Sequence, residues 1–408
     1  MGEQANSKVP RIRFKGCDEA WVKKRISEVA DVYDGTHQTP NYTKHGVMFL
    51  SVENIRSLRS DKFISEKAFE DFKVVPQNGD ILMTRIGDIG TANVVESNER
   101  IAYYVSLALL KLKGLAPYFL KQCISSNSVI EELRHRTLHI AFPKKINKNE
   151  IEKVVISLPQ LRQEQTQIGE YFRELDRLLE LHQRKHDKLV ALKKAMLQKM
   201  FPQPGATTPE IRFKGFSRDW VKKKLGESVL IQRGGSPRPI ESFITLDDNG
   251  INWVKIGDVK IGSRYITQTE EKIKPEGVSK SREVFKGDLI LSNSMSFGRP
   301  YLMAIDGCIH DGWLLIRNDK DLFDLNYLLQ LLSSEAMTEQ YRSLAAGGVV
   351  NNLNSALVQS TNIAFPDKSE QQKIGTYFRT LDALISKHAT QRQKLQHIKS
   401  ACLEKMFV

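Results

Sequence analysis

Apolar residues recur with a helical period in two long segments, residues 164–201 and 370–407. The recurring positions step alternately by four and three residues, a period typical of a coiled coil. They are Ile168, Phe172, Leu175, Leu179, His182, His186 and Leu189 in the first segment, and Ile374, Phe378, Leu381, Ile385, His388, Arg392 and Leu395 in the second. Pro159 and Pro366 precede the segments and Pro202 follows the first, as expected at helix ends. We predict two helices, each about 60 Å long.

Each predicted helix has one apolar stripe, so each needs a partner surface. The linker PQPGATTP, Pro202–Pro209, is short and rich in proline, so we expect the helices to pair antiparallel. The part of the chain that precedes each helix, called a body from here on, should then lie at one end of the pair, in an arrangement close to two-fold symmetric. The predicted helix-pairing and partner-docking residues are Ile168, Phe172, Leu175, Leu179, Leu189, Ile374, Phe378, Leu381, Ile385 and Leu395. The polar stripe positions are expected to fix register. The alternative is that each helix packs only on its own domain.

The chain also repeats itself before each body. PRIRFKGCDEAWVKK at Pro10–Lys24 and PEIRFKGFSRDWVKK at Pro209–Lys223 share ten of fifteen positions and start 199 residues apart. The two helical segments align without a gap, 206 residues apart. The chain is therefore a tandem duplication of two domains rather than a solenoid. We expect Phe14 and Phe213 to anchor the entry segments, and Trp21 and Trp220 to close the cores.

The bodies between these anchors have a mixed pattern. The β-rich runs DILMTRIG and DLILSNS open with Gly-Asp turns, whereas residues 116–136 and 324–344 have helical spacing. The predicted fold class is α+β: two tandem α+β domains separated by two long antiparallel coiled-coil helices, with pseudo-two-fold symmetry. We place the bodies at residues 1–157 and 204–365, and the helices at residues 158–203 and 366–408.

The net charge of the chain indicates the class of binding partner rather than the fold. The chain carries a net charge of +13, a surplus that favours polyanions, and nucleic acid is the commonest polyanion in a cytoplasm. No apolar run reaches the ~18 residues of a membrane helix. The four cysteines form no CxxC pair, which favours a reducing compartment, so we expect a cytoplasmic protein. A basic surface without a specific partner is the alternative.

Motifs for catalysis and cofactor binding are absent from the sequence. We find no Walker A motif, no GxGxxG after a strand, no GxSxG, no HExxH, no zinc-finger spacing and no NPPY-type tetrapeptide of amino-methyltransferases. His135 and His139 are four residues apart but have no visible third ligand, so we interpret them as surface or phosphate-facing residues. We therefore predict no catalytic residue, no metal site and no cofactor in this chain.

Several loops have a composition typical of loops that bind DNA. Arginine, asparagine and glutamine side chains can read base edges, while glycines let the backbone approach phosphates. DGTHQTPNYTKHG and QRGGSPRP are the two most prominent loops, and further polar residues follow the strand candidates. The predicted DNA-binding residues are Thr36, His37, Gln38, Lys44, Arg56, Arg85, Asp88, Arg233, Ser236, Arg238, Lys255, Asn293, Ser294 and Arg299.

The full chain resembles the specificity subunit of type I restriction–modification systems. The resemblance rests on the tandem plan, the two entry segments, the DGTHQTP and GGSP loops, the paired Gly-Asp strands, and the EQ-x-x-I-x-x-YF-x-x-LD motifs at Glu164–Asp176 and Glu370–Asp382. It implies that each body reads one half of a split double-stranded DNA site. It also implies that the helices dock two modification subunits, which bind S-adenosylmethionine and methylate adenine, and which a translocating restriction subunit can join. The specificity subunit itself would carry no catalysis.

Two other hypotheses remain open on the residues alone. One is a self-contained methyltransferase or nuclease with a novel site. The other is a coiled-coil DNA-binding scaffold without sequence readout, in which the basic charge is incidental. The two bodies are dissimilar between the repeated segments that flank them. If the chain is a specificity subunit, the two half-sites should therefore differ and the full site should not be a palindrome.

Overall fold

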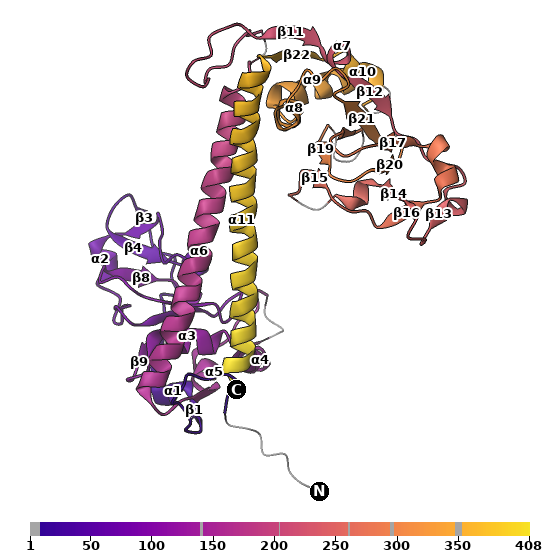
Figure 1. Cartoon of the computed structure of the whole chain (residues 1–408). Helices are drawn as coiled ribbons and strands as arrows, with labels where there is room; N and C mark the ends of the chain where they lie inside the picture. The colour runs from indigo at the N-terminus through magenta and orange to yellow at the C-terminus, as the bar shows by residue number, and fades with distance from the viewer. Residues whose placement is uncertain (1–8, 139–141, 204, 260–261, 294–297, 347–352) are drawn as a thin grey trace. The chain divides into compact units, whose positions relative to one another are not determined.

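The computed structural model describes the chain except residues 1–8, 139–141, 204, 260–261, 294–297 and 347–352 (Figure 1). It forms two compact units: unit 1 is Met1–His182 with Gln391–Val408, and unit 2 is Gln183–Thr390. The two longest helices are α6 (Arg162–Lys199) and α11 (Lys368–Met406), which confirms both helices predicted from the apolar stripes. Each unit contains one body and a part of both helices. The predicted domain boundaries, which separate bodies from helices, stay a prediction.

The body of unit 1 is built from two four-stranded sheets and a short antiparallel pair of strands. The strand orders are β2-β9-β6-β7, β3-β5-β4-β8 and β1-β10, and β4–β8 is the parallel pair among them. The strands are β1 (Val22–Arg25), β2 (Ala30–Asp34), β3 (Tyr42–Thr43), β4 (Val47–Leu50), β5 (Phe63–Ile64), β6 (Ile81–Thr84), β7 (Ala92–Val94), β8 (Ile101–Tyr103), β9 (Leu107–Leu112) and β10 (Val155–Leu158). The short helices are α1 (Ile26–Val29), η1 (Val52–Asn54), α2 (Glu66–Phe69), α3 (Pro117–Ile124), α4 (Asn127–His135) and α5 (Lys148–Glu152).

The body of unit 2 repeats this plan with two five-stranded sheets. The strand orders are β12-β21-β18-β19-β15, β13-β16-β14-β20-β17 and β11-β22. The strands are β11 (Val221–Lys224), β12 (Leu230–Arg233), β13 (Ile244–Thr245), β14 (Ile251–Val254), β15 (Tyr265–Ile266), β16 (Glu271–Ile273), β17 (Arg282–Val284), β18 (Leu289–Ser292), β19 (Pro300–Met303), β20 (Gly307–Ile309), β21 (Trp313–Arg317) and β22 (Asn362–Phe365). The helices are α7 (Leu225–Ser228), η2 (Ile240–Ser242), η3 (Ile256–Asp258), η4 (Pro275–Lys280), α8 (Leu325–Leu332), α9 (Glu335–Ala346) and α10 (Ser355–Gln359).

The Gly-Asp strands β6 and β18 lie in the middle of each body and are buried along their whole length. In β6, Ile81 and Met83 pack on the helix side with Phe119, whereas Leu82 packs on the other sheet with Tyr103. In β18, the odd and even residues divide in the same way between two clusters. A strand covered on both faces cannot alternate apolar and polar residues, which explains the continuous runs ILMT and LILS.

The entry segments form the base of each unit. Trp21 is buried and packs edge-on against Phe407, and Trp220 does the same against Phe201. Phe14 and Phe213 pack at the margins of the two cores. These positions confirm the expected roles of both tryptophans and both phenylalanines.

The entry segments also carry a repeated buried ion pair. Arg13 donates from Nε and Nη2 to the two carboxylate oxygens of Glu164, at 2.9 and 2.7 Å. Arg212 binds Glu370 in the same way, at 2.9 and 2.6 Å. The shared sequence IRFKG therefore serves to attach the chain entry to the first turn of a long helix.

Within each unit, the start of one long helix packs against the end of the other (Figure 1). In unit 1, Phe172 of α6 lies 5.9 Å from Phe407, just beyond α11, measured between ring centroids. In unit 2, Phe378 of α11 lies 6.2 Å from Phe201, just beyond α6. Both contacts require antiparallel helices, which confirms the predicted direction of pairing. The alternative in which each helix packs only on its own domain is therefore excluded.

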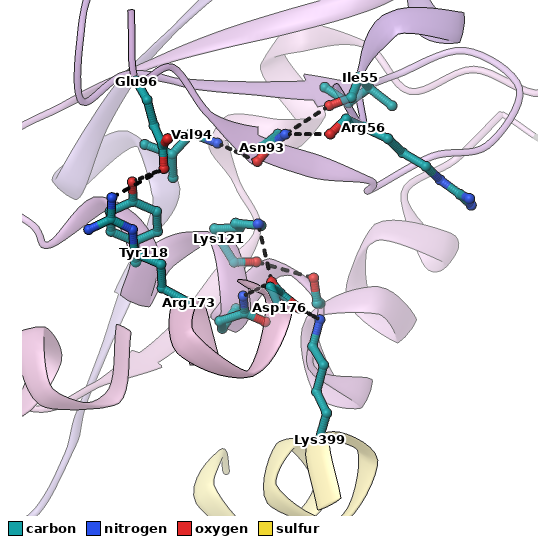
Figure 2. Close-up of polar contacts among 12 residues, drawn as sticks. Ile55, Arg56, Asn93, Val94, Glu96, Tyr118, Lys121, Arg173, Asp176 and Lys399 are labelled. Carbon is teal, nitrogen blue, oxygen red and sulfur yellow. Dashed lines mark hydrogen bonds and ion pairs between the residues drawn. The ribbon is translucent and has the colours of Figure 1, made fainter. Parts of the chain in front are cut away.

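A carboxylate at the end of each EQ-to-LD motif joins the two helices in each unit. Asp176 of α6 binds Lys399 of α11, with 2.5 Å between Oδ1 and Nζ (Figure 2). Asp382 of α11 binds Lys193 of α6. Asp382 and Lys399 lie 206 residues after Asp176 and Lys193, so the same pair occurs twice with the helices exchanged.

Each of these carboxylates also binds the body of its own unit. Asp176 accepts from Gln122 and Lys121 of α3, at 3.2 and 3.3 Å. Asp382 accepts from Gln330 of α8 at 3.4 Å and lies 3.8 Å from Arg264 Nε. Burial, more than the neighbouring arginine, lowers the pKa of the Lys193 ammonium, while Asp382 acts in the opposite direction. In each unit, one carboxylate thus contacts both the other long helix and the body.

Candidate nucleic-acid interface

The predicted DNA-binding loops lie at equivalent places in the two bodies, where strands of the two sheets end. Gly35 follows β2 and Gly234 follows β12, and both pack on the end of the neighbouring sheet. A Cβ added to Gly35 would lie 2.5 Å from the Tyr103 carbonyl oxygen, and one on Gly234 would lie 2.1 Å from that of His310. Only glycine allows this approach, so the loop after each strand begins from a fixed backbone position.

In unit 1, the loop after β2 begins with a backbone anchor and continues as exposed residues. The Thr36 amide donates to the Tyr103 carbonyl at 3.1 Å, and the Thr36 carbonyl accepts from Val105 at 2.9 Å. His37, Gln38 and Lys44 are exposed. Their side chains are therefore available at the surface, as the prediction of a reading loop requires.

Arg85, another predicted DNA-binding residue, is buried and holds this region together. Its guanidinium forms an ion pair with Asp34 and donates from Nε to the Ile146 carbonyl at 3.0 Å. Asp88, three residues further, is exposed and accepts a hydrogen bond from Thr91 at 2.8 Å. This geometry gives Arg85 a supporting role and places Asp88 at the surface of the same loop.

Two lysines that we did not single out from the sequence lie beside this loop. The Gly87 amide donates to the Lys144 carbonyl at 2.8 Å, and the Leu138 amide donates to the Lys145 carbonyl at 2.9 Å. Both lysine side chains are exposed, as is the neighbouring Phe142. The doubled lysine was visible in the sequence, but its pairing with a loop about 60 residues away was not.

Arg56 follows β4 and η1 and is exposed. Asn93 of β7 donates from Nδ2 to the carbonyls of Ile55 and Arg56, at 3.2 and 3.0 Å. Figure 2 shows the Arg56 side chain directed away from Asn93. The backbone here is held while the guanidinium remains at the surface.

In unit 2, four predicted residues meet at Asp311, which we did not predict. The Asp311 carbonyl accepts from Asn293 Nδ2 at 2.8 Å and from Arg233 Nε at 3.4 Å. Its carboxylate accepts from Ser236 at 3.0 Å and lies 3.7 Å from Arg238 Nη2. Asp311 lies in the short link between β20 and β21. We call these five residues the Asp311 cluster.

Two further predicted residues of unit 2, Lys255 and Arg299, make other contacts. Lys255 donates to Glu271 at 2.5 Å and is half-buried. Arg299 is exposed, and its backbone amide donates to the Ser292 hydroxyl at 3.1 Å. Ser294 lies outside the described residues.

The equivalent positions of the two bodies carry different chemistry. Register pairs β2 with β9 and β12 with β21, so Asp34 corresponds to Arg233, and the loop residue after β6, Arg85, corresponds to Asn293. An acid–base pair in unit 1 is thus replaced by an arginine and an amide in unit 2. One scaffold therefore presents two different sets of donors and acceptors.

The predicted helix-pairing residues divide between the two units. Ile168, Phe172 and Leu175 are buried in the core of unit 1, against which Leu395 packs. Ile374, Phe378 and Leu381 are buried in the core of unit 2, against which Leu189 packs. Leu179 and Ile385 are half-buried.

Within the described part of the chain, no cluster of three or more His, Cys, Asp and Glu residues is arranged to hold a metal ion. His135 lies at the end of α4, and His139 is outside the described residues. No helix among the described residues is long and apolar enough to span a membrane.

Comparison with known proteins identifies the family. The family model described as the type I restriction modification DNA specificity domain matches twice, at residues 18–191 and 217–397. The chain belongs to this family. The two matches follow the tandem duplication and together cover most of the sequence.

Two relatives from Methanocaldococcus jannaschii illustrate the similarity. A protein described as a type I restriction enzyme MjaX specificity subunit is 21% identical over 406 residues, covering 93% of this chain and 91% of the relative. The type I restriction enzyme MjaIX specificity subunit is 25% identical over 195 residues, covering 47% of this chain and 44% of the relative.

Solved structures show the same fold. The S subunit of a type I restriction–modification system from M. genitalium matches with a TM-score of 0.68 at 14% identity, covering 98% of this chain and 99% of that one. A chain from a structure of complex assembly and conformational transition in the type I R-M system matches with a TM-score of 0.51 at 18% identity, covering 97% and 98%. The predicted fold class, two tandem α+β domains with two long antiparallel helices, is confirmed.

Proposed function

We propose that this chain is the sequence-specific DNA recognition subunit of a type I restriction–modification complex, and that it reads an asymmetric bipartite site. The observation that carries the proposal is the pair of loop sets at equivalent positions of a duplicated scaffold. Because the exposed side chains of His37 and Gln38 after β2 differ in chemistry from that of Arg238 after β12, the two half-sites should differ. The net charge of +13 supports binding to the phosphate backbone.

Two modification subunits are the partners that this architecture suits best. Leu192 of α6 and Ile398 of α11 are exposed, at 41% and 45%, and lie 206 residues apart in equivalent positions. One residue of this equivalent pair lies in each unit, as two copies of the same partner would require. We propose that these subunits bind S-adenosylmethionine and methylate adenine, that a restriction subunit can join them, and that this chain carries no catalysis.

Methylome sequencing tests the proposal directly. The chain is expressed beside its modification subunit, and methylated adenines should define one split, non-palindromic motif. Exchanging residues 25–157 for the body of another family member should change one half of that motif and leave the other half intact. A change in both halves would contradict the assignment of one body to each half-site.

Activity of the purified chain separates this proposal from a self-contained enzyme. With S-adenosylmethionine and target DNA but no partner, we expect no methyl transfer, and robust transfer would overturn the proposal. A scaffold without sequence readout predicts instead that the assembled complex binds all DNA sequences equally.

A further inference from the structure

Asp311 is an acidic residue among groups suited to contact a polyanion. Arg233 and Arg238 are exposed on either side of it, and a carboxylate here opposes the attraction that these arginines exert on phosphates. A carboxylate that weakens the attraction to phosphates should have another role. The two roles open to it are to hold the loop in place and to accept a hydrogen bond from a base.

The loop is already held without the carboxylate. The Asp311 backbone carbonyl accepts from Asn293 and Arg233. The Asn293 amide donates to the Gly312 carbonyl at 3.1 Å, and Gly235 donates to the Ile309 carbonyl at 3.1 Å. These backbone contacts fix the link between β20 and β21 whatever side chain stands at position 311.

One oxygen of the Asp311 carboxylate accepts a hydrogen bond that orients the group, whereas the other oxygen has only a long ion-pair contact. Oδ1 accepts from the Ser236 hydroxyl at 3.0 Å, which sets the direction of the group. Among the described residues, Oδ2 contacts Arg238 Nη2 at 3.7 Å, and the side chains of Asp311 and Arg238 are 42% and 83% exposed. An ion pair this long and this exposed contributes little free energy and exchanges readily for another partner.

We propose that Asp311 is a specificity-determining residue of unit 2, which accepts a hydrogen bond from an exocyclic amino group of cytosine or adenine in the major groove. Asp and Glu accept from cytosine N4, and adenine N6 offers the same donor. The inference rests on the proposed DNA-recognition function and adds to it a residue and a base chemistry. Arg238, released from Oδ2, then turns to a neighbouring phosphate.

The feature belongs to unit 2 alone. In unit 1 the link between β8 and β9 contains Val105 at the corresponding position, which offers no side-chain acceptor. The amino group read by Asp311 should therefore occur in one half-site and have no counterpart read in this way in the other.

The variant Asp311→Asn tests the proposal, because it keeps the size of the side chain and one oxygen for Ser236 but replaces an acceptor with a donor. The variant and its modification subunit are assembled, and methylome sequencing and selection from a DNA library randomised in both half-sites are performed. We expect one position of the unit 2 half-site to lose its preference for an amino-bearing base by roughly 5- to 100-fold. The other half-site should stay unchanged.

Asp319→Asn is the matched control, because Asp319 is exposed in the same unit beyond the end of β21 and loses the same charge. It should leave the motif unchanged.

If Asp311→Asn selects the wild-type base at every position, the proposal is overturned. If Asp311→Asn fails to assemble, Asp311→Glu, which keeps the acceptor, is selected in the same way, and an unchanged preference for the amino-bearing base supports the proposal whereas its loss overturns it. If the wild-type complex itself shows no split motif, the DNA-recognition function fails instead.

Discussion

Arg13 and Arg212 are basic residues of a DNA-binding family, yet both are buried on glutamates of the long helices. The side chains of Arg13 and Glu164 are 9% and 1% exposed, and Trp21 also donates to Glu164 at 3.3 Å. Replacing Arg13 with Met would leave this carboxylate buried without its cation. We expect a loss of about 3–5 kcal/mol in the free energy of unfolding, measured by urea unfolding of the purified chain.

Arg11→Met is the control, since Arg11 is exposed two residues away and loses the same charge. It should shift the unfolding midpoint little. Equal shifts for the two variants would show that general charge, rather than the buried pair, sets the stability of this entry segment.

At the same scale, the sequence predicted loops whose polar side chains are partly exposed, but it did not predict the contacts of each side chain. His37, Gln38 and Arg238 are exposed as a reading role requires, whereas Arg85 is buried on Asp34, 51 residues away in the chain. Asp311 was missed because a single acid in the short link between β20 and β21 has no sequence signature. Both outcomes depend on long-range strand pairing, which loop composition does not encode.

At the scale of elements, the long helices are joined by ion pairs that the apolar period did not reveal. The stripes predicted the helices and their pairing because core packing imposes the period.

Lys193 and Asp382 lie beside the stripe, and Lys193 is 9% exposed. Asp382→Asn leaves the lysine without its charge partner, and we expect a loss on the order of 2–3 kcal/mol. Thermal unfolding measures the effect.

A double variant separates the pair from its surroundings. Adding Lys193→Met to Asp382→Asn removes both charges of this pair, so we expect part of the lost stability to return, because Arg264 still lacks the Asp382 carboxylate. Glu174→Asn is the comparison, because the Glu174–Arg177 pair is exposed, at 53% and 62%, and its loss should change the stability little. Strictly additive single and double variants would argue against a coupled ion pair.

At the scale of the whole molecule, the net charge of +13 predicts a polyanion partner but not where it binds. We propose a location in unit 1, where Lys144 and Lys145 lie exposed beside the loop that carries Asp88. Each lysine that contacts a phosphate releases about one counterion, so replacing both with Gln should reduce the salt slope of DNA binding by roughly 2. The measurement compares affinities of the assembled complex between low and physiological salt.

The matched control changes the same charge in the same unit. Lys23 and Lys24 are exposed on β1, which pairs with β10 at the base of the body. Because that strand belongs to the entry segment rather than to a reading loop, replacing both with Gln should leave the slope unchanged. Two equal reductions would mean that phosphate attraction is spread over the whole basic surface. A reduction confined to Lys144 and Lys145, with the methylated motif unchanged, would assign these lysines to backbone contact and leave base readout to the loops beside them.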